Sequence, residues 1–192
     1  MPRQREFDTD EVLGKAMEAF WANGYEATSV QDLVDQMGIQ RFSLYNTFGN
    51  KHQLFLAALD RYHKRVVGEL LAAVNKSEEG VPAIRRFFEG FVELYTSRPS
   101  SQGCLMVNSA LELLPNDRAA RDRVVTNFER MEKALHRALV RAQKREELRS
   151  RHSLRRLARF LVGSAQGLGV LAKSFPSRKA LEGFVDVALS AL

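Results

Sequence analysis

The sequence predicts an all-α protein of about nine helices, and three observations support this fold class. Apolar residues recur at the i, i+3, i+4 spacing of amphipathic helices along most of the 192 residues. No segment shows a convincing alternation of apolar and polar residues, which a half-buried strand would require. The glycines and prolines fall mostly between the periodic segments, where helices end. We therefore expect three N-terminal helices, a long connecting helix and a C-terminal helical domain.

The first helix is expected to begin at Asp8 or Thr9, either of which can accept a hydrogen bond from a free backbone N–H. It is expected to end at Asn23-Gly24. Its apolar positions share one face of a 3.6-residue period, and they are Val12, Leu13, Ala16, Met17, Phe20 and Trp21. Arg3 and Arg5 precede it as a basic arm, which either follows a phosphate backbone or is a disordered tail.

The segment from Thr28 to Lys51 predicts two short helices joined by a tight turn. Thr28 or Ser29 can cap the first of them, and Asp32 suits the positive end of its dipole. Gly38 ends that helix, because glycine adopts a left-handed turn conformation without steric cost. In the second helix Leu44 and Phe48 are expected to point inward. Two short helices around a glycine turn form a helix-turn-helix.

The outward side chains of the second short helix are mostly hydrogen-bonding groups, unlike the Glu/Lys mixture of an ordinary solvated face. No carboxylate occurs from Gln36 to Leu59, whereas Arg41, Lys51 and His52 are present. A nucleic-acid backbone repels carboxylates and attracts such cations, so this segment predicts a DNA-binding surface. The alternative is a solvent-facing turn in a helical bundle.

The run from Gly38 to Lys51, preceded by Thr28-Ser-Val, resembles the DNA-binding segment of TetR-family transcriptional regulators. The resemblance implies a homodimeric regulator of double-stranded DNA. We expect Thr28, Tyr45 and Lys51 to hold phosphates, and Gln40, Arg41 and Ser43 to reach base edges. The sequence departs from the family pattern at Phe42, which packs either on a thymine methyl or into the core. The full set of expected DNA contacts is Thr28, Gln40, Arg41, Phe42, Ser43, Tyr45, Asn46, Thr47 and Lys51.

A long helix is expected to follow from Lys51, with Asn50 as its cap and its N-terminus open to a phosphate. Its apolar face is expected to comprise Leu54, Phe55, Ala58, Leu59, Tyr62, Val66 and Leu70. A polar break at 76–82 predicts the domain boundary. We expect a DNA-binding domain over residues 1–50, a connecting helix over 51–75, and an effector-binding and dimerisation domain over 76–192.

Within that C-terminal domain the last two helices differ from the others. Glycine inside a helix costs about 1 kcal/mol relative to alanine, and it is tolerated where backbones approach closely. We predict that these helices form a four-helix bundle across a two-fold axis, as the family resemblance also implies. Packing within one protomer is the alternative. The expected interface residues are Gly163, Gly167, Val170, Leu181, Phe184, Val185 and Ala188.

Cys104 lies in Gly103-Cys104-Leu105, which resembles a segment in one branch of the family that includes electrophile-sensing repressors. A thiol at a helix N-terminus has its thiolate favoured by the dipole, so sensing is one reading of Cys104 and plain packing is the other. Polar Asn108 and Gln166 on apolar helices indicate a pocket. The candidate effector pocket comprises Phe88, Phe91, Tyr95, Cys104, Asn108, Phe128 and Gln166.

Composition narrows the class of protein. One cysteine excludes an internal disulfide framework, and no apolar run reaches the ~18 residues of a membrane span, so we expect a cytoplasmic location. The net charge of +6 does not itself argue for DNA, because residues 1–75 carry eight Lys/Arg against ten Asp/Glu. The basic excess lies further on, around Arg149–Arg159, where a solvated face or an acidic partner would explain it.

The sequence therefore predicts a ligand-responsive repressor that needs no cofactor or metal. An activator or a co-repressor-dependent regulator is the alternative within the same class. A protein-binding helical adaptor conflicts with the carboxylate-free segment. An enzyme that uses Cys104 as a nucleophile would need a base within reach, and none of the four histidines shows a motif that pairs with it.

Overall fold

The structure, a computed structural model, describes residues 7–97, 102–114, 116–175 and 177–192, and these residues contain helices and no strand. The basic arm with Arg3 and Arg5 lies outside the described residues. With α4, η1 and α5 counted as one continuous helix, the described residues form nine helices, as predicted. The elements are α1 (Thr9–Asn23), α2 (Val30–Met37), α3 (Arg41–Phe48), α4 (Lys51–Tyr62), the π-helical turn η1 (His63–Val67), α5 (Gly68–Lys76), α6 (Val81–Thr96), α7 (Leu105–Leu113), α8 (Arg118–Lys144), α9 (Leu154–Ser174) and α10 (Arg178–Leu189).

The N-terminal helices begin and end at the residues that the sequence indicates. Asp8 caps α1 through its carboxylate, which accepts the Asp10 N–H at 2.8 Å. Ser29 caps α2, because its hydroxyl accepts the Asp32 N–H while the Asp32 carboxylate accepts the Ser29 N–H. Gly38 ends α2 in the left-handed region with φ of 69°. Leu44 of α3 is fully buried, and α1 to α4 surround the N-terminal part of one continuous core.

The connecting helix contains a π-helical turn that the sequence does not reveal. At His63–Val67 each backbone hydrogen bond spans five residues in place of the usual four, as in the bond from the Gly68 N–H to the carbonyl of His63. The extra residue turns the following face, so Val67 and Leu71 are buried where Val66 and Leu70 were expected. Val66 and Leu70 do pack against the core, but they are only partly buried, so the centre of the inward face lies one position later than predicted.

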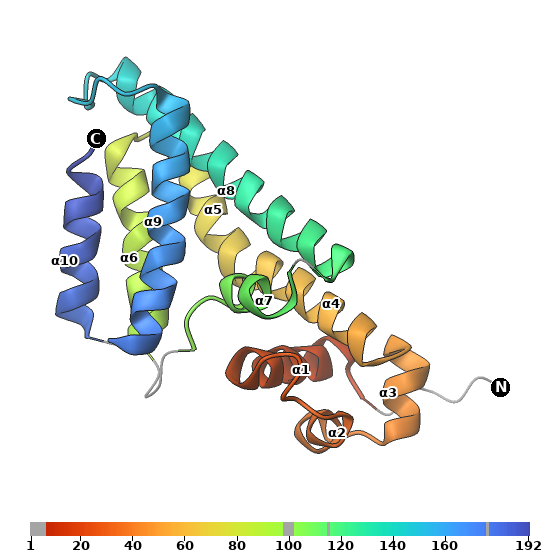
Figure 1. Cartoon of the computed structure of the whole chain (residues 1–192). Helices are drawn as coiled ribbons and strands as arrows, with labels where there is room; N and C mark the ends of the chain where they lie inside the picture. The colour runs from red at the N-terminus through yellow and green to blue at the C-terminus, as the bar shows by residue number, and fades with distance from the viewer. Residues whose placement is uncertain (1–6, 98–101, 115, 176) are drawn as a thin grey trace.

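The C-terminal helices pack around a second part of the same core (Figure 1). In the view of Figure 1, α6, α9 and α10 stand together at one end, while α8 and the connecting helix run diagonally toward the DNA-binding domain. Helix α7 lies between these parts and contacts α1, α4, α8 and α9. The apolar residues that recur at helical spacing on α6 are all buried, namely Ile84, Phe87, Phe88, Phe91, Val92 and Tyr95.

Candidate nucleic-acid interface

Helix α3 presents a surface that is free to meet another molecule. Phe42 is 73% exposed, so it does not turn back into the core, and Tyr45 is 42% exposed. Gln40 occupies the N-cap position without using its side chain as a cap. Arg41 is exposed, and no carboxylate within the described residues pairs with it. With Ser43, Asn46 and Thr47 beside them, these side chains form an outward face without a negative charge.

The expectation that Thr28 holds a phosphate is not met by the structure. Its side chain is 1% exposed, and its hydroxyl donates a hydrogen bond to the carbonyl of Gly24 at 2.6 Å. This bond closes the turn between α1 and α2, so the Thr28 hydroxyl is not available to a phosphate. Its role in this structure is to hold the entry to the helix-turn-helix.

The start of α4 keeps the features expected of a phosphate site. The Asn50 side chain accepts the Gln53 N–H at 2.8 Å, which leaves the N–H groups of Lys51 and His52 without a described hydrogen-bond partner. The Lys51 ammonium lies 4.4 Å from the centre of the Tyr25 ring and 3.5 Å from the Glu26 carbonyl. These contacts place a cation beside free backbone donors, an arrangement that attracts anions.

One functional contact that sequence reasoning missed joins α7 to the DNA-binding domain. The Glu112 carboxylate accepts the Tyr25 N–H at 2.9 Å and the Glu26 N–H at 2.7 Å, and so holds the loop between α1 and α2. Nearby, the Trp21 indole N–H donates to the carbonyl of Gly103 at 2.9 Å. The DNA-binding helices therefore rest directly on α7 and on the residue that precedes Cys104.

We expect Glu112→Ala to free the loop that the carboxylate holds. Hydrogen bonds to charged acceptors contribute about 1.5–3 kcal/mol when well formed, and solvent exposure of Glu112 reduces this. Amide hydrogen exchange at Tyr25 and Glu26 should accelerate about tenfold. The Gly24 amide, bonded to the Phe20 carbonyl at 2.8 Å, should keep its protection as an internal control. Unchanged exchange at both loop amides would show that Glu112 does not hold the loop in solution.

A second link joins the connecting helix to the long helix α8. The His52 Nε2 lies 2.6 Å from a carboxylate oxygen of Asp117, the residue that caps α8. Burial alone would raise the pKa of Asp117, but hydrogen bonds from the Ala120 N–H and from His52 lower it overall. Asp117 thus stays a carboxylate at neutral pH and fastens the first part of α4 to α8.

Cys104 is the N-cap of α7, but its thiol is buried, with 4% of the residue exposed. Burial raises the pKa of the thiol, and the N–H groups of Val107 and Met106 together with the hydroxyls of Tyr62 and Tyr95 offset this only in part. The expectation that the helix terminus favours the thiolate is therefore not met. Packing is the role that the structure supports for Cys104.

Native Cys104 should consequently react slowly with thiol reagents at neutral pH. Because its pKa is raised, the buried thiol stays protonated at neutral pH, and the thiol is not the reactive form. Labelling with iodoacetamide should therefore be at least about tenfold slower than in urea-unfolded protein. The native rate should rise only at alkaline pH. Mass spectrometry of labelled samples measures this, and equally fast labelling of the native and unfolded chains would contradict the burial argument.

The residues expected to form an effector pocket are largely core residues. Phe88, Phe91 and Tyr95 are at most 2% exposed. Asn108 is occupied, because its amide donates to the Gln102 carbonyl at 3.0 Å and its oxygen lies 3.4 Å from the Lys173 ammonium. Phe128 and Gln166 are partly buried. The cavity between the connecting helix and α8, described below, is lined by none of these residues or Cys104.

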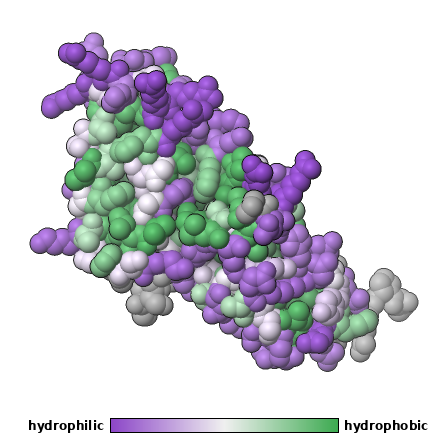
Figure 2. Space-filling model, in the orientation of Figure 1, coloured by the Kyte–Doolittle hydropathy of each residue, from purple (hydrophilic) through white to green (hydrophobic). Residues whose placement is uncertain are grey.

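The last two helices present an apolar face to solvent. Phe160 and Val170 of α9 are 48% and 46% exposed, and Val187 of α10 is 74% exposed. A Cβ atom added at Gly163 would meet nothing within 4 Å. Figure 2 shows hydrophobic surface gathered over this end of the molecule. We call these residues, together with Gly167 and Phe184, the α9–α10 patch.

Three residues expected at a dimer interface lie elsewhere. Leu181, Val185 and Ala188 are at most 4% exposed because α10 packs this face against α6 and α9 of its own protomer. The glycines of α9 also divide between two roles. Gly169 lies against Cys104 and Tyr95, where a Cβ would approach to 3.0 Å and 3.1 Å. Close packing inside the protomer therefore explains Gly169, while Gly163 remains open to solvent.

Comparisons with known proteins agree with this geometry. The family "Bacterial regulatory proteins, tetR family" matches residues 12–58, and "Tetracyclin repressor-like, C-terminal domain" matches residues 80–188. The chain is 37% identical over its full length, and over the full length of the relative, to the uncharacterized HTH-type transcriptional regulator YezE of Bacillus subtilis (strain 168). It is 34% identical to the HTH-type transcriptional repressor ComR of Escherichia coli (strain K12), with 93% of this chain and 86% of ComR covered.

A solved structure of the TetR-family regulator CifR, a cysteine mutant complexed with a 26-base-pair double-strand operator DNA, superposes with a TM-score of 0.87. The two chains are 30% identical, and the match covers 98% of each.

A short exposed helix that follows a glycine turn, on an all-helical chain with a separate C-terminal bundle, defines a helix-turn-helix transcriptional regulator that binds DNA. This chain belongs to the TetR family of bacterial regulatory proteins. Among its described helices, none is long and apolar enough to cross a membrane.

Proposed function

We propose that this chain is a homodimeric, ligand-responsive repressor that binds a palindromic operator through α3. The observation that carries the proposal is the exposed face of α3, which offers hydrogen-bonding groups, Arg41 and Phe42 and no carboxylate. The likeness to ComR, which is named a repressor, supports repression over activation. The likeness to CifR, which was solved with double-strand operator DNA, supports an operator as the DNA that is bound.

Each protomer would place α3 in a major groove. Gln40, Arg41 and Ser43 would contact base edges, with Arg41 suited to guanine because its guanidinium can bond two acceptors at once. Phe42 would pack on a thymine methyl, since its ring projects into solvent. Tyr45, Asn46, Thr47 and Lys51 would hold phosphates or support the helix beside them.

The α9–α10 patch would join two protomers into a four-helix bundle. A two-fold dimer presents its two α3 helices symmetrically, so the operator half-sites would be centred about 34–36 Å apart. We retain the proposed division into a DNA-binding domain at 1–50, a connecting helix at 51–75 and a dimerisation and effector domain at 76–192. A ligand in the last of these would favour a spacing of the α3 helices that does not fit the operator.

A gel shift against the DNA upstream of the chain's own coding sequence, at about 0.15 M salt, tests this function. We expect a discrete complex that survives an excess of unrelated DNA. An adaptor or an enzyme would give no such complex. An activator would bind DNA equally well, and it is distinguished by transcription from the bound promoter, which a repressor lowers.

A further inference from the structure

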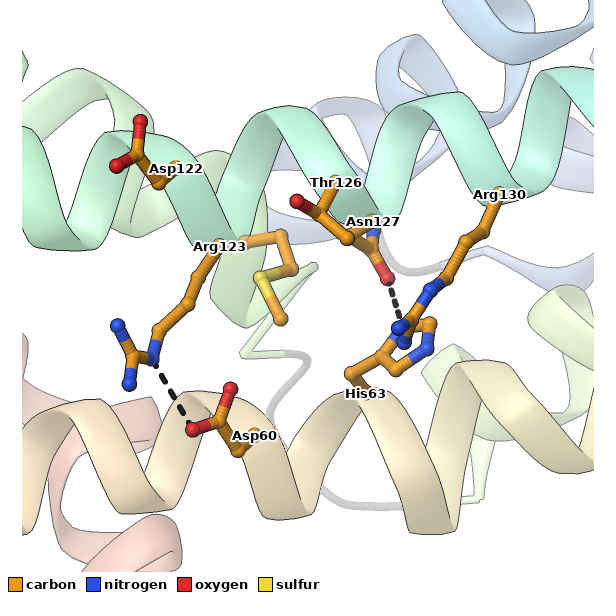
Figure 3. A pocket seen from close by; sticks show the side chains of 8 residues that line it. Asp60, His63, Asp122, Arg123, Thr126, Asn127 and Arg130 are labelled. Carbon is orange, nitrogen blue, oxygen red and sulfur yellow. Dashed lines mark hydrogen bonds and ion pairs between the residues drawn. The ribbon is translucent and has the colours of Figure 1, made fainter.

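A cleft lies between the connecting helix and α8, close to the π-helical turn (Figure 3). Its volume is about 220 Å³. The connecting helix contributes Asp60 and His63, α7 contributes Met106, and α8 contributes side chains that include Thr126, Asn127 and Arg130. A second, more open hollow of about 550 Å³ shares Asp60, His63 and Arg130, and it leads toward the side of α5. The cleft is therefore reachable from solvent.

The charges around the cleft leave one cation without a carboxylate. The Asp60 carboxylate pairs with the Arg123 guanidinium at 3.1 Å, so these two charges offset each other. Asp122 points its carboxylate away from the connecting helix in Figure 3. Arg130 extends from α8 toward His63, and no ion pair holds it within the described part of the chain. An unpaired guanidinium at the wall of a cleft attracts an anion.

His63 is held in place beside Arg130. Its Nδ1 lies 2.6 Å from Oδ1 of Asn127, and since a carbonyl oxygen only accepts, Nδ1 carries the proton and donates. The other ring nitrogen, Nε2, has no described hydrogen-bond partner, and it donates to a bound anion when the ring carries both protons. The π-helical turn begins at His63, and a Cβ at Gly68 would lie 2.9 Å from the His63 carbonyl. π-helical turns within α-helices occur frequently at functional sites.

We propose that this cleft binds a small organic carboxylate, with its charged group on Arg130 beside His63 and Thr126 and its apolar part against Met106. The planar guanidinium matches a carboxylate with two parallel hydrogen bonds. The thioether of Met106 adapts to apolar groups of varied shape. A volume of about 220 Å³ is below the ~300–1,000 Å³ of drug-sized pockets, so the ligand is small.

The position of the cleft gives this ligand a means to act on DNA binding. The helix that carries Asp60 and His63 begins at Lys51, beside the proposed DNA surface. A carboxylate that accepts hydrogen bonds from Arg130 of α8 and from the imidazolium form of His63 would favour one placement of the connecting helix relative to α8. Binding would then shift the population of α3 spacings. This inference rests on the proposed function as a ligand-responsive repressor.

The test is isothermal titration of the full-length protein with acetate, butyrate and benzoate, and with benzamide and inorganic phosphate as comparison ligands. We expect saturable binding of at least one carboxylate and none of benzamide, which lacks the charge. Arg130→Gln should weaken that binding at least about tenfold. Arg121→Gln is the matched control, because it removes the same charge from an exposed position on α8 outside the cleft, and it should leave binding unchanged.

Three outcomes would overturn the proposal. They are no binding of any of the three carboxylates, equal binding by wild type and Arg130→Gln, and binding of inorganic phosphate alone. Gel shifts on the same samples keep this inference separate from the proposed function. Operator binding without carboxylate binding would reject only the cleft as a carboxylate site, whereas absence of operator binding would reject the repressor itself.

Discussion

Val187→Glu should convert the proposed dimer into a folded monomer and lower operator affinity by about 10²–10⁴-fold. Val187 is 74% exposed in the protomer, so a carboxylate there meets water and should not disturb the fold. In the proposed four-helix bundle the same carboxylate would be buried against the partner's apolar surface, without a compensating charge. A monomer binds one half-site and loses the gain from linking two α3 helices, which accounts for the expected loss.

Sedimentation velocity measures the oligomeric state of this variant, circular dichroism its helix content, and a gel shift its operator affinity. Val125→Glu is the matched control, since Val125 is 42% exposed on α8 and lies outside the α9–α10 patch. It should remain dimeric and bind the operator as wild type does. If Val187→Glu also stayed dimeric with full affinity, the α9–α10 patch would not be the dimer interface.

Arg41→Ala should weaken operator binding by about 1–3 kcal/mol, which is roughly 5- to 150-fold, and relax specificity at one base position. Arg41 is exposed in the first turn of α3 and engages no carboxylate among the described residues, so its truncation should cost no stability. A bidentate contact to guanine is lost only at the base pair that Arg41 meets. A titration of operators with single base changes separates this effect from a general loss.

Lys144→Ala, at the far end of α8, removes a charge of the same sign from an exposed site and should leave operator affinity unchanged. If Arg41→Ala instead weakened binding equally on every DNA sequence, Arg41 would contact only phosphate. The slope of log affinity against log salt concentration would then fall in magnitude by about one, which a titration at several salt concentrations would detect.

The helix boundaries and the exposed face of α3 could be predicted from the sequence because they depend on local chemistry. Asp8 and Ser29 cap helices through backbone groups two or three residues away, and Gly38 ends α2 through its own φ. The outward face of α3 follows from the helical period. Leu44 is buried and Phe48, one turn later, packs against the core, so the positions between them point outward. The charges on this face can be read from the sequence, which has no carboxylate there.

The contacts of Glu112 could not be predicted in this way. Its partners Tyr25 and Glu26 lie 87 and 86 residues away, and an exposed glutamate on an amphipathic helix looks like any solvated carboxylate. The π-helical turn at His63–Val67 also leaves no mark in composition, yet it moves the buried face by one residue. Both features depend on how α4 and α7 pack, which only the folded chain determines.

Only some of the residues on the proposed dimer surface could be predicted, for a related reason. Helix α10 is apolar on two sides, and the period of a helix does not say which side the protomer buries. Packing against α6 takes Leu181 and Val185, which leaves Val187 exposed. Burial also determines the protonation of Cys104, because removal of the thiol from water raises its pKa more than the N–H groups at the helix terminus lower it.

The central claim is that two α3 helices, related by a two-fold axis, recognise a palindromic DNA sequence. Selection of binding sites from a pool of random duplex DNA, with wild type and Arg41→Ala in parallel, tests it most directly. We expect wild type to enrich an inverted repeat with half-sites about one helical turn apart, and Arg41→Ala to lose preference at one symmetric pair of positions. Enrichment of a sequence without inverted symmetry, or of no sequence at all, would contradict the account.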